Sequence, residues 1–211
     1  MFPLDWQAVV DYVGLPCILK DAHGGGWREV YVCHSLEELL HHYDHSGLLT
    51  MIVQEFIEWE EFVRCICIGR EQILPIRYDP RARKYHPDRD FLPAAQMQRI
   101  VDDSRTLVRA LGYDMNSIEW ALRDGVPYAI DFMNPAPDLD VYSLTAAWFE
   151  PAVTALADMA IRLAKEPPAD PRRAWQTFLG AVPPPDAAGP ARGRSAAKPR
   201  APRKPRPAKG G

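Results

Sequence analysis

The sequence predicts an α+β fold with mainly antiparallel sheets. Two hairpin patterns and a set of amphipathic helical segments support this prediction. Asp124-Gly125 separates two apolar runs, and Arg70-Glu71 joins two more. Residues 93–111 place apolar side chains on one side of a helix, which is typical of a helix packed on a sheet. A length of 211 residues suits one domain or two small lobes, and 47% hydrophobic residues suffice for a core.

The remaining elements follow from caps, turns and spacing. Asp5 caps a first helix that ends at Gly14, and Ser35 with Glu38 forms a capping box for a second. Pro151 lies inside the pattern of the last helix, where a start or a kink is expected. Helices are expected over 5–13, 35–43, 93–111 and 144–164, and strands over 16–19, 27–33, 51–56, 61–69, 72–78 and the two arms around Asp124-Gly125.

Charge is distributed unevenly along the chain. Residues 191–211 hold eight basic residues and no acid, which leaves 17 basic against 28 acidic residues, a net charge of −11, in residues 1–190. An acidic body argues against a nucleic-acid-binding core. The proline-rich basic segment is expected to be disordered, and it offers a contact for anionic surfaces.

Cysteine usage and hydropathy predict a cytoplasmic protein. None of the four cysteines lies in a CxxC pair, and Cys65 and Cys67 fit a buried reduced pair better than a metal or redox site. No apolar run reaches membrane-spanning length, and the N-terminus has no basic flank of the kind that a signal peptide carries. A membrane partner is therefore not expected, and homo-oligomerisation stays open.

Three polar residues stand out in the hairpin over 117–138. Glu119 lies in its first arm, and Asp131 and Asn134 lie in its second. Their oxygens are the hard ligands that Mg²⁺ accepts, usually together with phosphate oxygens. The alternative is a surface hairpin with solvated acids. Residues three apart in a regular strand face opposite ways, so Asn134 can join the acids only if a bulge near Phe132–Met133 or the strand end turns it back.

A strand that ends in Lys20 is followed at once by the turn Asp21-Ala22-His23-Gly24-Gly25-Gly26. Glycines allow backbone amides to approach a phosphate, and a lysine adds a flexible positive charge. The pattern is not a Walker A loop, because a strand follows it. A plain hairpin turn is the alternative.

A short segment then links two groups of strands, and clefts at such links are favoured ligand sites. The backbone of Glu55–Ile57 offers donors and acceptors for the edge of an adenine, and Glu60 or Glu61 offers acceptors for ribose hydroxyls. The alternative is a solvated strand end. The residues concerned are Gln54, Glu55, Phe56, Ile57, Glu60 and Glu61.

Taken in order, these motifs resemble the ATP-grasp family, notably its carboxylate–amine ligase branch. PCILKDAHGGGWREVYVCHSLEEL is similar to the family's lysine strand and phosphate loop, IVQEFIEWEEFVR to its adenine hinge, and SIEWALRDGVPYAIDFMNPAP to its metal-binding hairpin. The resemblance covers about residues 3–165. It implies a small lobe over 1–57 and a large lobe with the hairpin over 58–166. The composition of the remaining residues, rich in proline, alanine and basic residues, predicts a largely disordered tail over 167–211.

The resemblance also implies roles. Lys20 would contact the α/β-phosphates of ATP, and Gly24, Gly25 and Gly26 would close over them. Glu55 and Ile57 would bind adenine through their backbones, with Glu60 or Glu61 on the ribose. The Mg²⁺ ligands would be Glu119, Asp131 and Asn134, and the residues neutralising the transferred phosphoryl group would be Arg77, Arg64 and Lys84.

The reaction implied is ATP-dependent, ADP-forming activation of a small carboxylate to an acyl phosphate, followed by displacement of phosphate by an amine, thiol or other nucleophile. Family members carry a further N-terminal α/β domain, whereas Met1 lies next to the first expected helix. Three alternatives stay open: an N-terminally truncated copy without that domain, a start that was assigned too late, or a partner that supplies the domain. The alternative hypothesis is a non-catalytic, grasp-like adaptor whose basic tail binds anionic partners.

Overall fold

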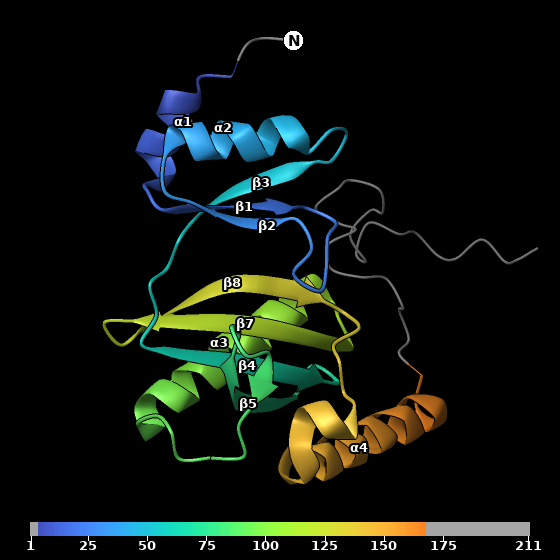
Figure 1. Cartoon of the computed structure of the whole chain (residues 1–211). Coiled ribbons are helices and arrows are strands. Elements are labelled where there is room, and N and C mark those ends of the chain that lie inside the picture. Colours follow the sequence, from blue (N-terminus) through green and yellow to red (C-terminus); the bar gives the residue numbers. More distant parts are fainter. Residues whose placement is uncertain (1–3, 168–211) are drawn as a thin grey trace, which may run out of the picture.

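The computed structural model describes residues 4–167. Within them, helices and strands alternate in the order α1 (Trp6–Val13), β1 (Cys17–Asp21), β2 (Val30–Cys33), α2 (Leu36–His45), β3 (Met51–Glu55), β4 (Glu61–Ile68), β5 (Gln72–Asp79), β6 (Lys84–Tyr85), α3 (Ala94–Leu111), β7 (Met115–Arg123), β8 (Val126–Asn134) and α4 (Val141–Lys165). They form two antiparallel sheets with the orders β2-β1-β3 and β6-β5-β4-β7-β8. The α+β prediction is confirmed, and Figure 1 shows the small sheet above β8.

The small sheet is covered on one face by α1 and α2 (Figure 1). The Asp5 carboxylate accepts a hydrogen bond from the Ala8 amide, and the Ser35 hydroxyl accepts one from the Glu38 amide, so both predicted caps are present. Alternate strand residues fill the space under the helices, because strand side chains point to opposite faces in turn. The buried members of this core are Val10, Cys17, Leu19, Cys33 and Leu39.

The other face of the small sheet carries no helix. The register pairs Ile18 with Val32 and Lys20 with Ile52, so these side chains share that face. Val32 is 42% exposed and Ile52 is 41% exposed. On the side away from its helices, the small sheet therefore presents apolar side chains together with Lys20 and Gln54.

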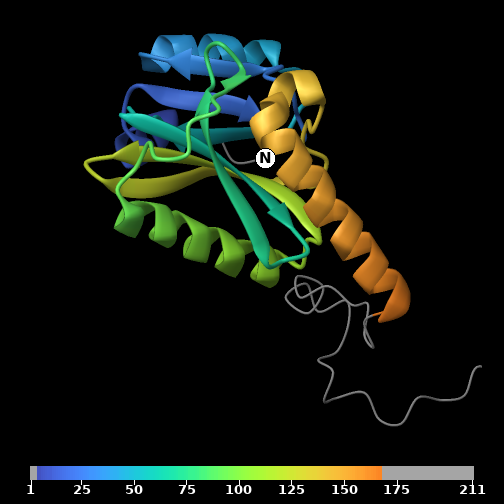
Figure 2. The same cartoon turned by 90° about the horizontal axis from the view of Figure 1, so that it is seen from below.

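The large sheet is buried on both faces. Alternation along β4 sends Phe62 and Ile66 toward α4, and Val63 and Cys65 toward α3. The same alternation in β7 places Trp120 against α3, where its indole N–H donates to the Ser104 hydroxyl at 2.9 Å. Figure 2 shows α3 and α4 running along different sides of the strands. The core is thus two layers of side chains with the sheet between them.

The last helix differs from the prediction in where it bends. Thr145 has φ 64° and ψ 161°, so it interrupts the helical backbone one turn after Val141, whereas Pro151 lies inside the helix. Pro151 has no N–H to donate to the Ala147 carbonyl. Arg89 donates to that carbonyl at 3.0 Å instead and stacks on Trp148. The expected kink at Pro151 is therefore wrong, because a side chain from outside the helix replaces the missing donor.

Two other expectations need correction. The second strand begins at Val30 rather than Trp27, because residues 22–29 form a longer turn. Residues 79–90, expected as a loop, contain the short strand β6, which pairs with the end of β5. The buried Tyr85 ring holds β6 against Tyr78, so one aromatic residue in a polar stretch was the available signal.

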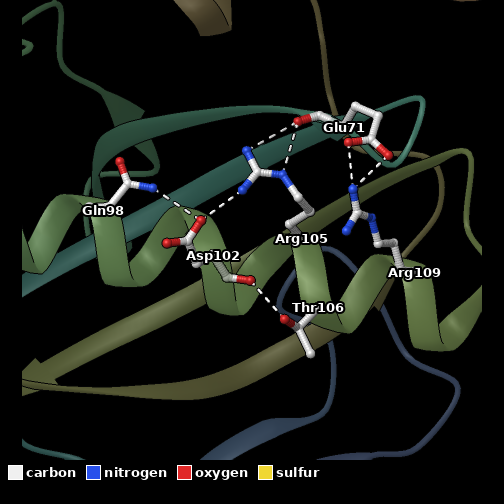
Figure 3. A network of polar contacts seen from close by, with 6 residues as sticks. All are labelled: Glu71, Gln98, Asp102, Arg105, Thr106 and Arg109. Carbon is white, nitrogen blue, oxygen red and sulfur yellow. Dashed lines mark hydrogen bonds and ion pairs between the residues drawn. The ribbon is translucent and has the colours of Figure 1, made fainter.

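A polar network connects α3 with the β4–β5 turn on the surface (Figure 3). Arg109 pairs with the Glu71 carboxylate, and Arg105 contacts the Glu71 carbonyl and Asp102. These side chains are largely exposed, so each pair contributes at most about 1 kcal/mol. The network fixes the end of α3 rather than supplying much of the stability.

All four cysteines are buried and free, which confirms the expectation for Cys65 and Cys67. Burial raises the pKa of the Cys65 thiol to about 12 and that of the Cys33 thiol to about 11. No helix within residues 4–167 combines the length and apolar character needed to cross a membrane. The predicted tail from residue 168 onward lies outside the described residues.

Candidate functional site

The β7–β8 hairpin brings its three predicted metal ligands to one face. Glu119 lies opposite Asp131, and Ser117 lies opposite Asn134, so two steps along β7 match three along β8. The extra residue is a bulge between Asp131 and Asn134, which is one of the two ways in which Asn134 was expected to turn back toward the acids. Directly opposed residues in antiparallel strands share a face, and so do residues two apart in a regular strand. The hairpin therefore puts both acids and the amide on the same side.

A buried asparagine supports this bulge. Asn116 is 0% exposed, and its side-chain N–H donates to the Phe132 carbonyl at 2.8 Å. The Asn134 side-chain oxygen accepts from the Ala136 amide at 3.2 Å, which fixes the direction of Asn134 at the end of the strand. At the bulge, the Asn116 side chain thus supplies the hydrogen bond that a backbone N–H of the neighbouring strand supplies in a regular antiparallel pair.

A second irregularity lies one residue before Asp131. Glu119 and Trp120 are adjacent in β7, but their partners Asp131 and Ala129 are two apart, which leaves Ile130 as the extra residue. The Ile130 carbonyl accepts a hydrogen bond from the Lys20 ammonium group at 3.1 Å. Lys20 belongs to β1, so this contact joins the small sheet to the large one beside Asp131. The predicted phosphate lysine and the predicted metal carboxylates therefore meet between the sheets.

Glu119 forms an ion pair with Arg64, its neighbour across β4 and β7. The two side chains are 14% and 13% exposed. Arg64 also donates to the Tyr85 hydroxyl at 3.1 Å and stacks on the Tyr78 ring, with its central carbon 4.0 Å from the ring centroid. Its Nε is buried without a hydrogen-bond partner among residues 4–167. The guanidinium is thus held in place, and its Nε–H makes no hydrogen bond within these residues.

The electrostatics of the pair follow from its burial. Desolvation raises the pKa of Glu119, and the nearby Asp131 carboxylate raises it further, while Arg64 and then Lys20 act in the opposite direction. Desolvation lowers the pKa of Arg64, but Glu119 and the two tyrosines outweigh it, so the net shift is upward. Arg64 stays charged, and Glu119 is a carboxylate whose charge depends on its cationic neighbours.

The donor set fits a Mg²⁺ site that is completed by a ligand. Within residues 4–167, no cluster of three or more histidine, cysteine, aspartate or glutamate side chains is placed to hold a metal unaided. Two carboxylates and an amide oxygen on one face match a site that shares its ion with phosphate oxygens. The histidines of α2 likewise form ring contacts among His41, His42 and His45 but, within residues 4–167, no metal site.

The glycine-rich turn extends from the small sheet toward the large one (Figure 1). The Asp21 carboxylate accepts from the His23 amide at 3.0 Å, so it is engaged within the turn. A Cβ on Gly24 would lie 3.1 Å from the Asp21 Cβ, and Gly26 has φ 65°. These two glycines are therefore required by the shape of the turn. The structure shows no contact between Gly24–Gly26 and the hairpin acids.

The hinge segment is anchored at both ends. The Glu55 carboxylate pairs with Arg123 of the β7–β8 hairpin at 3.2 Å, and the Ile57 side chain is buried in the core of the large lobe. Phe56 and Trp59 rings lie 6.0 Å apart between them. Gln54 lies opposite Ile18, on the open face of the small sheet. The backbone of the segment thus runs between the two sheets in a fixed position.

Arg77 lies apart from Arg64. It opposes Val63, whereas Arg64 opposes Ile76, so the two arginines occupy opposite faces of the sheet. Arg77 pairs with Glu61 at 2.8 Å and with Asp88 at 3.3 Å. A polar pocket of about 400 Å³ near the hinge is lined by Arg77, Glu61 and Glu60, among others. The structure therefore divides the predicted residues into a hairpin group and a pocket group.

Lys84 belongs to neither group. It lies in β6 opposite Asp79 and is exposed. Its neighbour Tyr85 is buried and points toward Arg64. The sequence analysis did not identify two further features of the site. One is the supporting Asn116, a buried polar residue in an apolar strand; the other is the apolar open face of the small sheet, for which strand alternation was the available signal.

The chain is similar to known proteins in sequence and in fold. No family model matches the chain. A D-alanine–D-alanine ligase of Ralstonia nicotianae is 26% identical over 181 residues, which cover 76% of this chain and 54% of the ligase. The chain thus spans about half the length of the curated relatives it matches.

Solved structures show the same architecture. A D-alanine–D-alanine ligase of Bacillus anthracis complexed with ATP superposes with a TM-score of 0.62, at 20% identity, over 80% of this chain and 58% of the other. The biotin carboxylase domain of a Hydrogenobacter thermophilus 2-oxoglutarate carboxylase, in complex with MgADP, has a TM-score of 0.59 at 17% identity, over 76% of this chain and 39% of the other. The fold is common to enzymes whose structures contain these nucleotides.

Proposed function

We propose that this chain, which has the ATP-grasp fold, binds ATP with Mg²⁺ between its two sheets. We propose further that it is an ADP-forming carboxylate–amine ligase or the nucleotide-binding part of one. One observation carries the proposal: the bulged β8 places Glu119, Asp131 and Asn134 on one face, with Lys20 reaching the same strand from the opposite sheet. Anionic ligands and a lysine across a gap between sheets suit a triphosphate with its metal.

Each proposed contact uses a group that the fold positions. Lys20 would exchange the Ile130 carbonyl for phosphate oxygens, and the amides of Gly24–Gly26 would close over them. Adenine would lie against the apolar open face near Val32 and bond the backbone of Glu55–Ile57, with Glu60 or Glu61 on the ribose. Mg²⁺ bound by the hairpin would offset negative charge on the phosphates.

The proposed reaction is phosphoryl transfer followed by ligation. A carboxylate oxygen of the substrate attacks the γ-phosphorus, ADP leaves, and an amine or another nucleophile then displaces phosphate from the acyl phosphate. Arg64 would neutralise charge on the transferred group, and Arg77 and Lys84 stay predictions for this role. D-Alanine is the first carboxylate to assay, because the curated relatives are named for it. A cytoplasmic location remains a prediction.

Calorimetric titration with ATP and Mg²⁺ tests the proposal. We expect saturable binding that Lys20→Met weakens by at least about tenfold, because the change removes a phosphate-facing positive charge. Lys165→Met, at the end of α4, is the matched control and should leave the affinity unchanged. The proposal fails if the unaltered chain shows no saturable binding at millimolar ATP.

The bulge itself offers a second prediction. Deleting Met133 leaves Asp131 and Asn134 separated by one residue, which a regular strand places on one face. We expect Mg²⁺-dependent ATP affinity to stay within about threefold of the parent, while Asn116 loses its bonding partner at a cost of about 1–3 kcal/mol. Inserting alanine after Met133 should instead reduce the affinity strongly, because it moves the Asn134 side chain about 3.4 Å farther along the strand from Asp131. Equal affinities in the deletion and the insertion would show that Asn134 is no ligand.

A further inference from the structure

The Arg64–Glu119 pair places a fixed cation on one of the proposed metal ligands. Arg64 contacts Glu119 directly, and Asp131 lies across the strand from Glu119. A divalent ion between the two carboxylates would therefore meet a positive charge already held there. The guanidinium of Arg64 and a divalent ion bound to the same carboxylate would repel each other strongly, because solvent is partly excluded there.

Arg64 has no freedom to withdraw into solvent. Its guanidinium stacks on Tyr78, bonds the Tyr85 hydroxyl and is only 13% exposed. A guanidinium has five N–H donors. In Arg64 one nitrogen serves Tyr85, one serves Glu119, and Nε is buried without a partner within residues 4–167. Nε is closed to an incoming ligand by its burial, but the two terminal nitrogens each carry two N–H groups, and one group of each serves Tyr85 or Glu119, so the guanidinium keeps donors for a second anion beside Glu119.

We infer that Arg64 couples metal binding to nucleotide binding by holding Glu119 until a phosphate replaces it. Without nucleotide, Arg64 satisfies Glu119 and disfavours a bare divalent ion. With nucleotide, phosphate oxygens take over the guanidinium donors, and Glu119 becomes available to the metal. Metal and nucleotide then bind cooperatively, and the coupling is reciprocal. The inference rests on the proposed function, because it assigns a regulatory role within that site.

Titration with Mn²⁺, monitored by its electron paramagnetic resonance signal, tests the coupling. In the unaltered chain we expect Mn²⁺ alone to bind at least about tenfold more weakly than Mn²⁺ with saturating ADP. Arg64→Met should tighten the binding of Mn²⁺ alone by at least about tenfold, because it removes the competing charge. Adding Glu119→Gln to that variant should abolish the gain.

The matched control is Arg70→Met. Arg70 also forms a part-buried ion pair, with Asp114 at 2.9 Å, but it lies in the β4–β5 turn away from the hairpin acids. Its loss changes the net charge equally and should not alter Mn²⁺ binding. The inference is overturned if Arg64→Met binds bare Mn²⁺ no more tightly than the parent, or if Arg70→Met shows the same gain.

The unaltered chain gives an independent check in case Arg64→Met does not fold. Equal Mn²⁺ affinity with and without ADP in that chain overturns the inference by itself. The failures of the two proposals can be told apart. Saturable Mg-ATP binding together with equal Mn²⁺ affinity in the presence and absence of ADP refutes the coupling alone, whereas absence of any nucleotide binding refutes the proposed function and, with it, the coupling that rests on it.

Discussion

Asp131→Asn should abolish the Mg²⁺-dependent part of ATP binding while leaving the fold intact. The substitution keeps the shape of the side chain but replaces one of two anionic oxygen donors with a neutral amide. Loss of groups that merely orient metal ligands costs about 10- to 100-fold in affinity, so loss of a charged ligand should cost at least about 100-fold. Calorimetry with ATP in the presence and absence of Mg²⁺ measures the effect.

The hairpin supplies its own control for this change. Asp124→Asn makes the same chemical substitution in the turn of the hairpin, where φ is 53° and asparagine is well tolerated. It should change neither ATP affinity nor its Mg²⁺ dependence. Because Asp131 is exposed, the free energy of unfolding should shift by no more than about 0.5 kcal/mol in Asp131→Asn. Unchanged Mg²⁺ dependence in Asp131→Asn would remove this residue from the metal site.

Local patterns predicted most of the fold because each element carries its own signals. Caps at Asp5 and Ser35, the Asp124-Gly125 turn and strand alternation are encoded by neighbouring residues. The need for a bulge or a strand end to turn Asn134 back followed from strand periodicity alone, and the bulge is present. Where the signal is local and the physics is short-ranged, sequence reasoning was sufficient.

The errors and omissions come from contacts between distant segments. Arg89, 62 positions before Pro151 in the chain, donates to the Ala147 carbonyl that Pro151 cannot reach, and the helical backbone is interrupted at Thr145 instead. The separation of Arg64 from Arg77 depends on the register between β4 and β5, which fixes faces only when both strands are aligned. The Lys20 contact with Ile130 likewise needs the relative position of two sheets.

Trp120→Ala should have the largest effect on stability among these changes. Trp120 follows Glu119 in β7 and lies on the opposite face of the strand, toward α3. Trp120 is 4% exposed, packs between the sheet and α3, and bonds the fully buried Ser104. Truncation leaves a large cavity and an unpaired hydroxyl, for which about 3–5 kcal/mol of unfolding free energy is expected. Urea unfolding monitored by far-ultraviolet circular dichroism measures the loss.

Trp27→Ala is the matched control, because it removes an indole from an exposed position instead of a buried one. Trp27 is 43% exposed in the β1–β2 turn, so its removal should change the unfolding free energy by no more than about 0.5 kcal/mol. Under conditions where Trp120→Ala remains folded, its Mg-ATP affinity should match the parent, since side chains on adjacent strand residues face opposite ways. A Trp120→Ala protein as stable as the parent would mean that α3 is held to the sheet by other contacts. A folded Trp120→Ala protein with lost Mg²⁺ dependence would mean that the two faces of β7 are not independent.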